Sequence, residues 1–310
     1  MSWKVCKNSS SRRIELLKKE ICYICLMKIA AFSEKCKNEL AEVYDSAEVN
    51  ALVKLLLQER LKLSFSEIRF QEDRELPDEQ LSVLEKDLVR LKTGEPVQHV
   101  LGYTWFHDLK ILVSGDVLIP RPETEELVSF IQDYSLPEEA NLLDICCGSG
   151  CIALALKHHF TSAKVFAADV SDVALELAAE NSRVLSLPLN IFKWNVLEEK
   201  CPESDLPLFE VIVSNPPYVR MEEINEMHPN VVKFEPHLAL FVPDDEPLLF
   251  YRIIADFSSQ QLKKGGRLWF EINMAHGEEV AEMLEQKGYS DVRIYHDMSG
   301  NDRFVSAVNW

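Results

Sequence analysis

The segment Asn215-Pro216-Pro217-Tyr218 contains the residue types that point most directly to chemistry. It follows an apolar run at residues 209–214 that predicts a buried strand, and its two prolines exclude helix and ladder pairing, so we expect a rigid loop at the strand's carboxyl end. The side-chain oxygen of Asn215 and the backbone carbonyl of Pro216 can each accept one N–H of a planar NH2 group, on which Tyr218 can stack. These acceptors would hold the nitrogen in line with an electrophilic methyl group and withdraw charge as the bond forms. A loop that is only structural would not explain the polar Asn215.

A glycine-containing turn follows the first strand predicted in the same half of the chain. It consists of Cys146, Cys147, Gly148, Ser149 and Gly150. Asp169 ends the next predicted strand, 19 residues after Gly150, where a carboxylate can accept hydrogen bonds from both hydroxyls of a ribose. The turn and Asp169 together predict a nucleoside-containing cofactor. The spacing of the turn also fits a dinucleotide fingerprint, so on this evidence the cofactor stays open.

The elements that must position these residues alternate between strand and helix from residue 141 onward. The expected strands are 141–146, 164–169, 189–193, 209–214, 266–272, 290–295 and 304–309, and the expected helices are 123–134, 150–159, 172–185, 248–262 and 276–287. Such alternation predicts a parallel, doubly wound sheet with helices on both faces. The carboxyl ends of its strands share one edge, so we expect the glycine turn, Asp169 and the proline loop to meet there.

The preceding part of the chain is expected to be helical from about residue 14 to residue 91. Two apolar stripes have helical spacing: Leu52, Leu55 and Leu56, and Leu81, Leu84, Leu88 and Leu91. Pro77-Asp78 predicts the start of the second of these helices. Residues 97–119 alternate and are rich in Val, Ile, Tyr and Trp, which predicts a β-hairpin linker. Residues 1–13 are polar and basic and indicate a loose extension.

The charge balance argues against a protein that binds nucleic acid broadly. The 310 residues include 33 Lys and Arg and 51 Asp and Glu, a formal net charge of −18. Residues 1–90 hold 16 of each sign, so the whole excess lies in residues 91–310, which indicates two units with different surfaces. An acidic surface repels phosphates.

The cysteines and the apolar runs bear on metals and compartment. Cys22-x-x-Cys25 could be half of a zinc site or a redox pair, but no second pair follows at matching distance, so we expect two cysteines on a partly buried helix and no metal. The longest apolar stretch, residues 21–32, is too short to span a bilayer, and no small-residue cleavage site stands out. A cytoplasmic protein with no membrane contact is expected.

The proline loop resembles that of the S-adenosylmethionine-dependent amino-methyltransferases. A closer resemblance lies in Leu118-Ile119-Pro120-Arg121-Pro122-Glu123-Thr124-Glu125, which is similar to the signature ahead of the catalytic domain in the PrmC/HemK family, the peptide chain release factor glutamine methyltransferases. Glu271-Ile272 with His276-Gly277, and Gly300-Asn301-Asp302-Arg303, resemble later strand ends of that family. The resemblance covers residues 45–310 and is specific from residue 93 onward.

This resemblance implies a Rossmann-like, seven-stranded S-adenosylmethionine-dependent methyltransferase domain at residues 121–310. Before it would lie an N-terminal extension (1–26), a helical substrate-recognition domain (27–92) and the β-hairpin linker (93–120). The implied activity is transfer of a methyl group to the side-chain nitrogen (N5) of the glutamine in the Gly-Gly-Gln loop of release factors. A monomer is expected.

The resemblance also assigns the site. The cofactor S-adenosyl-L-methionine would be held by Cys146, Cys147, Gly148, Ser149, Gly150, Asp169, Asn195, Val196 and Asn215. Asn195 and Val196 would flank the adenine. The glutamine would be held by Asn215, Pro216, Pro217 and Tyr218, of which Asn215, Pro216 and Tyr218 would be catalytic. Two positions depart from the family pattern: Cys146 stands where Gly is usual and Asn195 where an acidic residue is usual.

Three alternatives remain open on the sequence. The first is a glutamine methyltransferase for a ribosomal protein, a sister family with the same tetrapeptide. The second is an adenine-N6 methyltransferase of DNA or RNA, against which the charge of −18 argues because such enzymes must extrude a base and bind phosphates. The third is a non-enzymatic scaffold, against which the intact proline loop and Asp169 argue.

Overall fold

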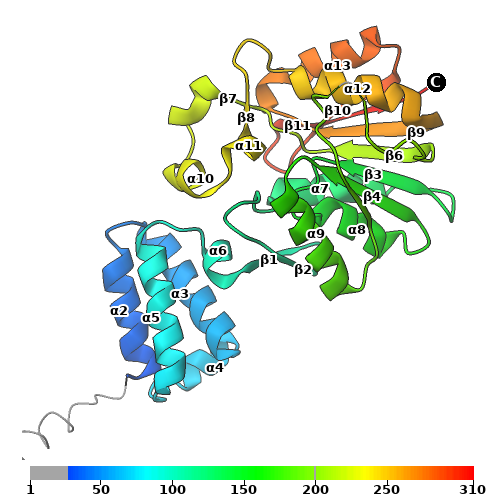
Figure 1. The fold of residues 1–310 in the computed structure, drawn as a ribbon. Coiled ribbons are helices and arrows are strands. Elements are labelled where there is room, and N and C mark those ends of the chain that lie inside the picture. Colours follow the sequence, from blue (N-terminus) through cyan, green and yellow to red (C-terminus); the bar gives the residue numbers. More distant parts are fainter. Residues whose placement is uncertain (1–26, 199) are drawn as a thin grey trace, which may run out of the picture. The chain divides into compact units, whose positions relative to one another are not determined.

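The computed structural model describes residues 27–198 and 200–310, and the chain divides into two compact units at Leu101/Gly102 (Figure 1). Cys22 and Cys25 lie outside the described residues, so the expectation for them stays a prediction. Within the described part, no helix combines the length and the apolar character that crossing a membrane requires.

The first unit is helical, as predicted. Its helices are α2 (Ile29–Leu40), α3 (Ser46–Leu61), α4 (Phe65–Phe70), α5 (Asp78–Lys92) and α6 (Val97–Leu101). Asp45 caps α3 by accepting hydrogen bonds from the backbone N–H groups of Ala47 (2.8 Å) and Glu48 (2.9 Å). Helix α5 begins at Asp78 after Pro77, which confirms the predicted start.

One stripe of this unit was assigned incorrectly. Leu52 and Leu56 are buried, but Leu55 is 37% exposed, and the inward face of α3 is completed by Val53 and Leu57 instead. Leu55, Leu56 and Leu57 follow one another on α3, and three consecutive residues of a helix cannot all point toward the core.

The second unit opens with a hairpin. Strands β1 (Tyr103–Phe106) and β2 (Leu109–Leu112) pair antiparallel through a two-residue turn, in which His107 and Asp108 adopt φ of 47° and 61°. The predicted hairpin is therefore confirmed over residues 103–112. It is wrong over residues 97–101, which form α6: the N–H of Val100 donates to the carbonyl of Pro96 at 3.1 Å, and His99 and Val100 are buried in the helical unit.

The main sheet of the second unit has seven strands. They are β3 (Asn141–Ile145), β4 (Lys164–Asp169), β5 (Asn190–Lys193), β6 (Phe209–Ser214), β9 (Leu262–Glu271), β10 (Ser290–His296) and β11 (Asp302–Val308), in the order β10-β11-β9-β6-β3-β4-β5. Its helices are α7 (Pro122–Gln132), α8 (Cys151–His159), α9 (Asp172–Leu185), α12 (Leu249–Gln261) and α13 (Gly277–Gln286).

Both faces of the sheet are covered, as Figure 1 shows. One core contains Leu142, Val211 and Val213 with the apolar sides of α7 and α8. The other contains Leu143 and Ile212 with those of α12 and α13. Successive residues of a strand point to opposite faces, so a strand buried on both sides is apolar at every position, which explains the continuous apolar runs of the sequence.

The expected parallel sheet has one exception. β11 runs antiparallel to both β9 and β10, while β3, β4, β5, β6 and β9 are parallel. Only residues 297–301 connect β10 to β11, and a parallel pair would need a crossover connection of a dozen residues or more.

A segment that the sequence did not divide into elements lies between β6 and α12. It contains β7 (Val219–Arg220), the 3-10 helix η1 (Met221–Asn225), α10 (Pro229–Phe234), α11 (His237–Leu240) and β8 (Phe241–Val242), and β7 pairs parallel with β8. A second 3-10 helix, η2 (Met274–His276), precedes α13.

Candidate active site

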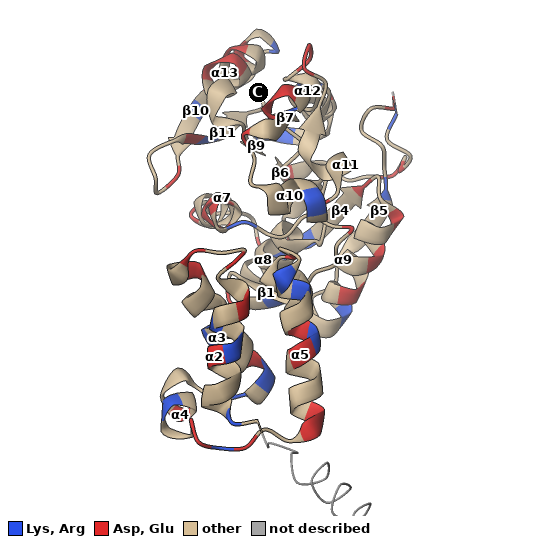
Figure 2. Cartoon of the chain, turned by 90° about the vertical axis from the view of Figure 1, so that its left-hand side faces the viewer, with Lys and Arg blue, Asp and Glu red and all other residues tan. Residues whose placement is uncertain are grey.

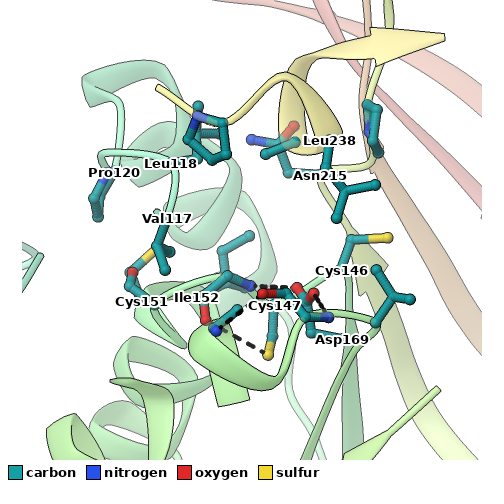
Figure 3. A pocket seen from close by; sticks show the side chains of 18 of the residues that line it. Val117, Leu118, Pro120, Cys146, Cys147, Cys151, Ile152, Asp169, Asn215 and Leu238 are labelled. Carbon is teal, nitrogen blue, oxygen red and sulfur yellow. Dashed lines mark hydrogen bonds between the residues drawn. The ribbon is translucent and has the colours of Figure 1, made fainter. Parts of the chain in front are cut away.

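A cavity of about 220 Å³ lies at the carboxyl edge of β3, β4, β5 and β6. Nine residues predicted for the site line it: Cys146, Cys147, Gly148, Ser149, Asp169, Asn195, Val196, Asn215 and Pro217. The structure therefore brings together the glycine turn, the acidic strand end and the proline loop. Asn215 and Asp169 approach the cavity from opposite sides (Figure 3).

The glycine turn has a backbone that most residues avoid. Cys146, Gly148 and Gly150 have φ of 61°, 53° and 78°. Gly150 is the N-cap residue of α8 and is not among the residues that line the cavity. A Cβ atom at Gly150 would lie 3.1 Å from the Cβ of Ala178, so this glycine allows close packing of the turn on α9.

A buried side chain of α9 holds the turn in place. The Oδ1 of Asn181 accepts a hydrogen bond from the backbone N–H of Leu112 (2.7 Å), and its Nδ2 donates to the carbonyls of Leu112 (3.1 Å) and Ser149 (3.0 Å). Asn181 is fully buried. It thus joins β2 of the hairpin to the turn, and sequence reasoning gave no sign of it.

Asp169 supports the turn as well as facing the cavity. Its Oδ2 accepts from the N–H of Gly148 and its Oδ1 from the N–H of Ser171, both at 2.9 Å. Burial raises the pKa of its carboxyl group, and these backbone hydrogen bonds oppose that rise. Each carboxylate oxygen can accept a second hydrogen bond, so the carboxylate can still receive two hydroxyl groups of a ribose.

The remaining walls suit a nucleoside. Most of the lining is apolar and includes Val117, Leu118, Ile152, Leu197, Leu238 and Phe250. Ser149 and Trp194 line the cavity, and each has a buried polar atom, Oγ and Nε1, with no hydrogen-bond partner among the residues that the structure describes. Buried polar groups are normally satisfied, so both atoms are available to a ligand with polar groups. Asn195 uses its Oδ1 to accept from the N–H of Leu197 at 3.1 Å and keeps further capacity on that oxygen.

A second cavity, of about 380 Å³, adjoins the first. The two share Leu118, Arg121, Asn215 and Ala239 in their walls. The second cavity is surrounded by charged or titratable residues and by one phenol, that of Tyr218. The others are Arg121, Glu123, His228, Glu271 and Arg303. Asn215 therefore stands between an apolar cavity and a polar one.

Hydrogen bonds link Asn215 to Tyr218 through two residues from other elements. The Nδ2 of Asn215 lies 3.4 Å from the Oγ1 of Thr124, which donates to Glu271 Oε2 at 2.7 Å. The Oη of Tyr218 donates to Glu271 Oε1 at 3.2 Å. Burial raises the pKa of Glu271, while its hydrogen bonds to Thr124 and Tyr218 and the nearby Arg303 oppose the rise.

Besides Gly150, two predicted site residues lie outside the wall of the first cavity. Pro216 is buried and lines neither cavity, and Tyr218 lines the second cavity instead of the first. Stacking of Tyr218 on a substrate stays a prediction. Thr124, Glu271 and Arg303 were noticed only as parts of resembling motifs, and Leu238, which comes from α11, carries no sequence signal.

Cys146 and Cys147 in the turn and Cys151 at the start of α8 remain neutral thiols. Burial raises the pKa of Cys146 and Cys147 well above the usual thiol range and that of Cys151 to about 12. Neutral thiols are poor nucleophiles and poor metal ligands. In residues 27–198 and 200–310, no group of three or more His, Cys, Asp or Glu residues could hold a metal ion.

A mostly parallel seven-stranded sheet with this glycine turn, Asp169 and an Asn-Pro-Pro-Tyr loop at one edge defines an S-adenosylmethionine-dependent methyltransferase. Residues 33–102 match the PrmC N-terminal domain, and residues 123–233 match the methyltransferase small domain. The chain belongs to the release factor glutamine methyltransferase family, as its relatives establish.

Two of these relatives are similar over most of their length. The release factor glutamine methyltransferase of Flavobacterium psychrophilum is 38% identical over 283 residues, which are 90% of this chain and 98% of that protein. That of Bacteroides thetaiotaomicron is 40% identical, covering 87% of this chain and 96% of that protein. Among solved structures, the catalytic domain of hMettl16 has a TM-score of 0.50 and 16% identity over 75% of this chain and 82% of that chain, and this likeness shows the fold alone.

Proposed function

We propose that this protein transfers a methyl group from S-adenosylmethionine to the side-chain nitrogen (N5) of the glutamine in the Gly-Gly-Gln loop of peptide chain release factors. The observation that carries the proposal is the position of Asn215 in the shared wall of the two cavities. Donor and acceptor would meet at its amide group. The printed names of the relatives support the release factor as the substrate.

The chemistry needs orientation more than a base. A glutamine amide nitrogen is a weak nucleophile because its lone pair is delocalised into the carbonyl. S-adenosylmethionine, when bound, supplies an electrophilic methyl group on a sulfonium. Asn215 Oδ1 and the Pro216 carbonyl accept the two N–H groups of the substrate, fix the NH2 plane and stabilise the positive charge that develops on nitrogen. The nitrogen would gain the methyl group as the bond from that group to the sulfonium sulfur breaks and leaves a neutral thioether, and it would then lose one proton to solvent, so no strong base is required.

The cofactor residues divide into polar and apolar roles. Asp169 accepts the ribose hydroxyls, and Cys146, Cys147, Gly148, Ser149 and Gly150 form the turn beside it. Asn195 and Val196 flank the adenine, with the Asn195 amide oxygen accepting from the adenine amine. Tyr218 completes the wall on the substrate side, and Pro217 lies next to it in the wall of the first cavity. These assignments are supported by the position of nine of the residues around one cavity.

The acidic surface supports a basic partner. Acidic residues follow one another along α7, α9 and α13 (Figure 2). A release factor works against ribosomal RNA, so its working surface is expected to be basic. The electrostatic field of a protein with a net charge of −18 would steer that surface toward the site. Association rates should then fall as ionic strength rises, and rates that do not depend on salt would contradict this steering.

The domains would share the task. The helical unit, which ends at residue 101, recognises the release factor, residues 102–120 connect, and residues 121–310 carry out the transfer. The protein acts in the cytoplasm as a monomer, without direct contact to nucleic acid or membrane. Residues 1–26 are not needed, so their deletion should leave activity unchanged, whereas loss of folding would show that they belong to the core.

Mass spectrometry of release-factor peptides tests the proposal. Purified release factor is incubated with the enzyme and labelled S-adenosylmethionine, and one added methyl group is expected on the loop glutamine. Ribosomal proteins serve as the competing substrates in parallel reactions. Label on a ribosomal protein and none on the release factor would assign the protein to the sister activity.

A further inference from the structure

The amide of Asn215 can work in only one of its two orientations. Its oxygen accepts an N–H, but its NH2 group, which has nearly the same shape, would place donor against donor at a substrate amine. A rotation of 180° about the last side-chain bond would therefore remove the proposed interaction without changing the packing. Something must choose the orientation.

We propose that Thr124 and Glu271 are positioning residues that keep the amide oxygen of Asn215 turned toward the substrate. This inference deepens the proposed function and rests on it. Thr124 lies in the first turn of α7 and Glu271 at the end of β9, and their side chains meet at 2.7 Å (Oγ1 to Oε2). Thr124 is 2% exposed and Glu271 1% exposed, so loss of their hydrogen bond leaves a buried polar group without its partner.

Counting donors fixes the direction of each bond. A carboxylate only accepts, so the single proton of the Thr124 hydroxyl goes to Glu271. The hydroxyl oxygen can then only accept from Asn215, and an acceptor selects the Nδ2 end of the amide, 3.4 Å away. Asn215 Oδ1 is left to face the substrate. Glu271 thus sets the orientation of Asn215 from two residues away.

The same carboxylate also holds the other end of the tetrapeptide. Its second oxygen, Oε1, accepts from the phenol of Tyr218 at 3.2 Å. One carboxylate therefore fixes Tyr218 directly and Asn215 indirectly, through Thr124. Asn215 and Tyr218 border the second cavity together with Glu271. Both directions require Glu271 to be ionised, because a protonated oxygen would become a donor and reverse one of them.

A matched pair of variants separates positioning from simple packing. Thr124→Val keeps the shape of the side chain but lacks the hydroxyl, and Thr124→Ser keeps the hydroxyl but lacks the methyl group. Thr124→Val should lower kcat on the order of 10²-fold, as small misplacements of a reacting group do, with little change in KM for S-adenosylmethionine. Thr124→Ser should restore most of the loss. A Thr124→Ser variant as slow as Thr124→Val would overturn the proposal.

A second measurement does not depend on activity. The side-chain NH2 signals of Asn215 in the 15N-labelled protein are assigned by their absence in Asn215→Asp. In the wild type and Thr124→Ser, their exchange with solvent should be slow, and in Thr124→Val and Glu271→Gln it should be faster. Unchanged exchange in Thr124→Val and Glu271→Gln would also overturn the proposal.

The two measurements distinguish this inference from the proposed function. A wild-type enzyme that does not methylate the release factor, but shows the expected exchange pattern, would contradict the choice of substrate and keep the positioning. An active wild-type enzyme whose Thr124→Val variant is equally active, with unchanged exchange, would contradict the positioning alone.

Discussion

Arg121 and Glu235 form an ion pair that ties the chain before α7 to the segment between α10 and α11. Arg121 Nη2 lies 2.6 Å from Glu235 Oε1, and the other oxygen of Glu235 accepts from the N–H of Ile119 at 3.2 Å. The side chain of Glu235 is 1% exposed. Because Arg121 borders both cavities, and Pro236 the first, the pair closes one side of the site.

Arg121→Met should therefore open this side of the site. The variant leaves a buried carboxylate without its cation, which should lower the free energy of unfolding by up to about 3 kcal/mol. This is the lower end of the range for a broken buried pair, because Arg121 is partly exposed. Hydrogen exchange of residues 229–242 should become faster. The control is Arg252→Met, which breaks the exposed pair with Glu246 and should cost less than about 1 kcal/mol. Equal effects of the two variants would show that Glu235 needs no cation.

Asn215→Ala should reduce turnover far more than cofactor affinity. The variant loses the acceptor that orients the substrate nitrogen, so kcat should fall on the order of 10²-fold or more. Calorimetric titration with S-adenosylmethionine should show only a small change in Kd. Asn225→Ala, on an exposed position of η1, is the matched control and should behave as the wild type. A parallel loss of turnover and cofactor affinity would contradict the proposed role.

Asp169→Ala should weaken cofactor binding. Hydrogen bonds to a charged acceptor contribute about 1.5–3 kcal/mol, so Kd should rise roughly 10- to 100-fold. The variant also loses the contact with the Gly148 N–H, so the turn should become less ordered. Asp172→Ala, three residues later, removes an exposed carboxylate that pairs with Lys193 and should leave Kd unchanged. A Kd that stays constant in Asp169→Ala would exclude Asp169 from the cofactor site.

The rate at saturating substrates should fall on the acid side because of Glu271. Burial raises the pKa of Glu271, and its working form is the carboxylate, so activity is lost as the pH falls through that raised pKa. The groups that face it are Thr124 and Glu123 from α7, Tyr218 from the proline loop, Tyr251 from α12 and Arg303 from β11. Glu271→Gln should be slower and should lack this acid limb. An unchanged limb in Glu271→Gln would assign it to another group.

Replacing Cys146 should show the strain of the turn. Its φ of 61° costs an L-residue about 1–2 kcal/mol, and glycine avoids that cost but gives back about 0.5–1 kcal/mol in chain entropy. Cys146→Gly should therefore change the free energy of unfolding by no more than about 1.5 kcal/mol, and Cys146→Val should be clearly less stable. Urea unfolding measures both. Cys201, where φ is not positive, is the control. There the Gly variant should be less stable than the Val variant.

The sequence could predict the strands of the main sheet because their apolar runs are continuous. It could also place Asn215 at the sheet edge, because Asn215 lies directly between a predicted strand and two prolines that end it. It could not predict the contact of Thr124 with Glu271, which are 147 residues apart, because that contact depends on where α7 begins beside β9. Periodicity also does not tell a short helix from a strand, which is why residues 97–101 were misassigned. The antiparallel direction of β11 could have been predicted, because its connection to β10 is too short for a parallel crossover.

The shared wall at Asn215 also has a kinetic consequence. Because both cavities meet at one side chain, the methyl group can pass directly from sulfur to nitrogen. The neutral thiols of Cys146, Cys147 and Cys151 are not suited to carry it as a methylated enzyme intermediate. Both substrates must then be present together. Double-reciprocal plots should give intersecting lines, not parallel ones, and a methyl group made chiral with hydrogen isotopes should arrive on nitrogen inverted.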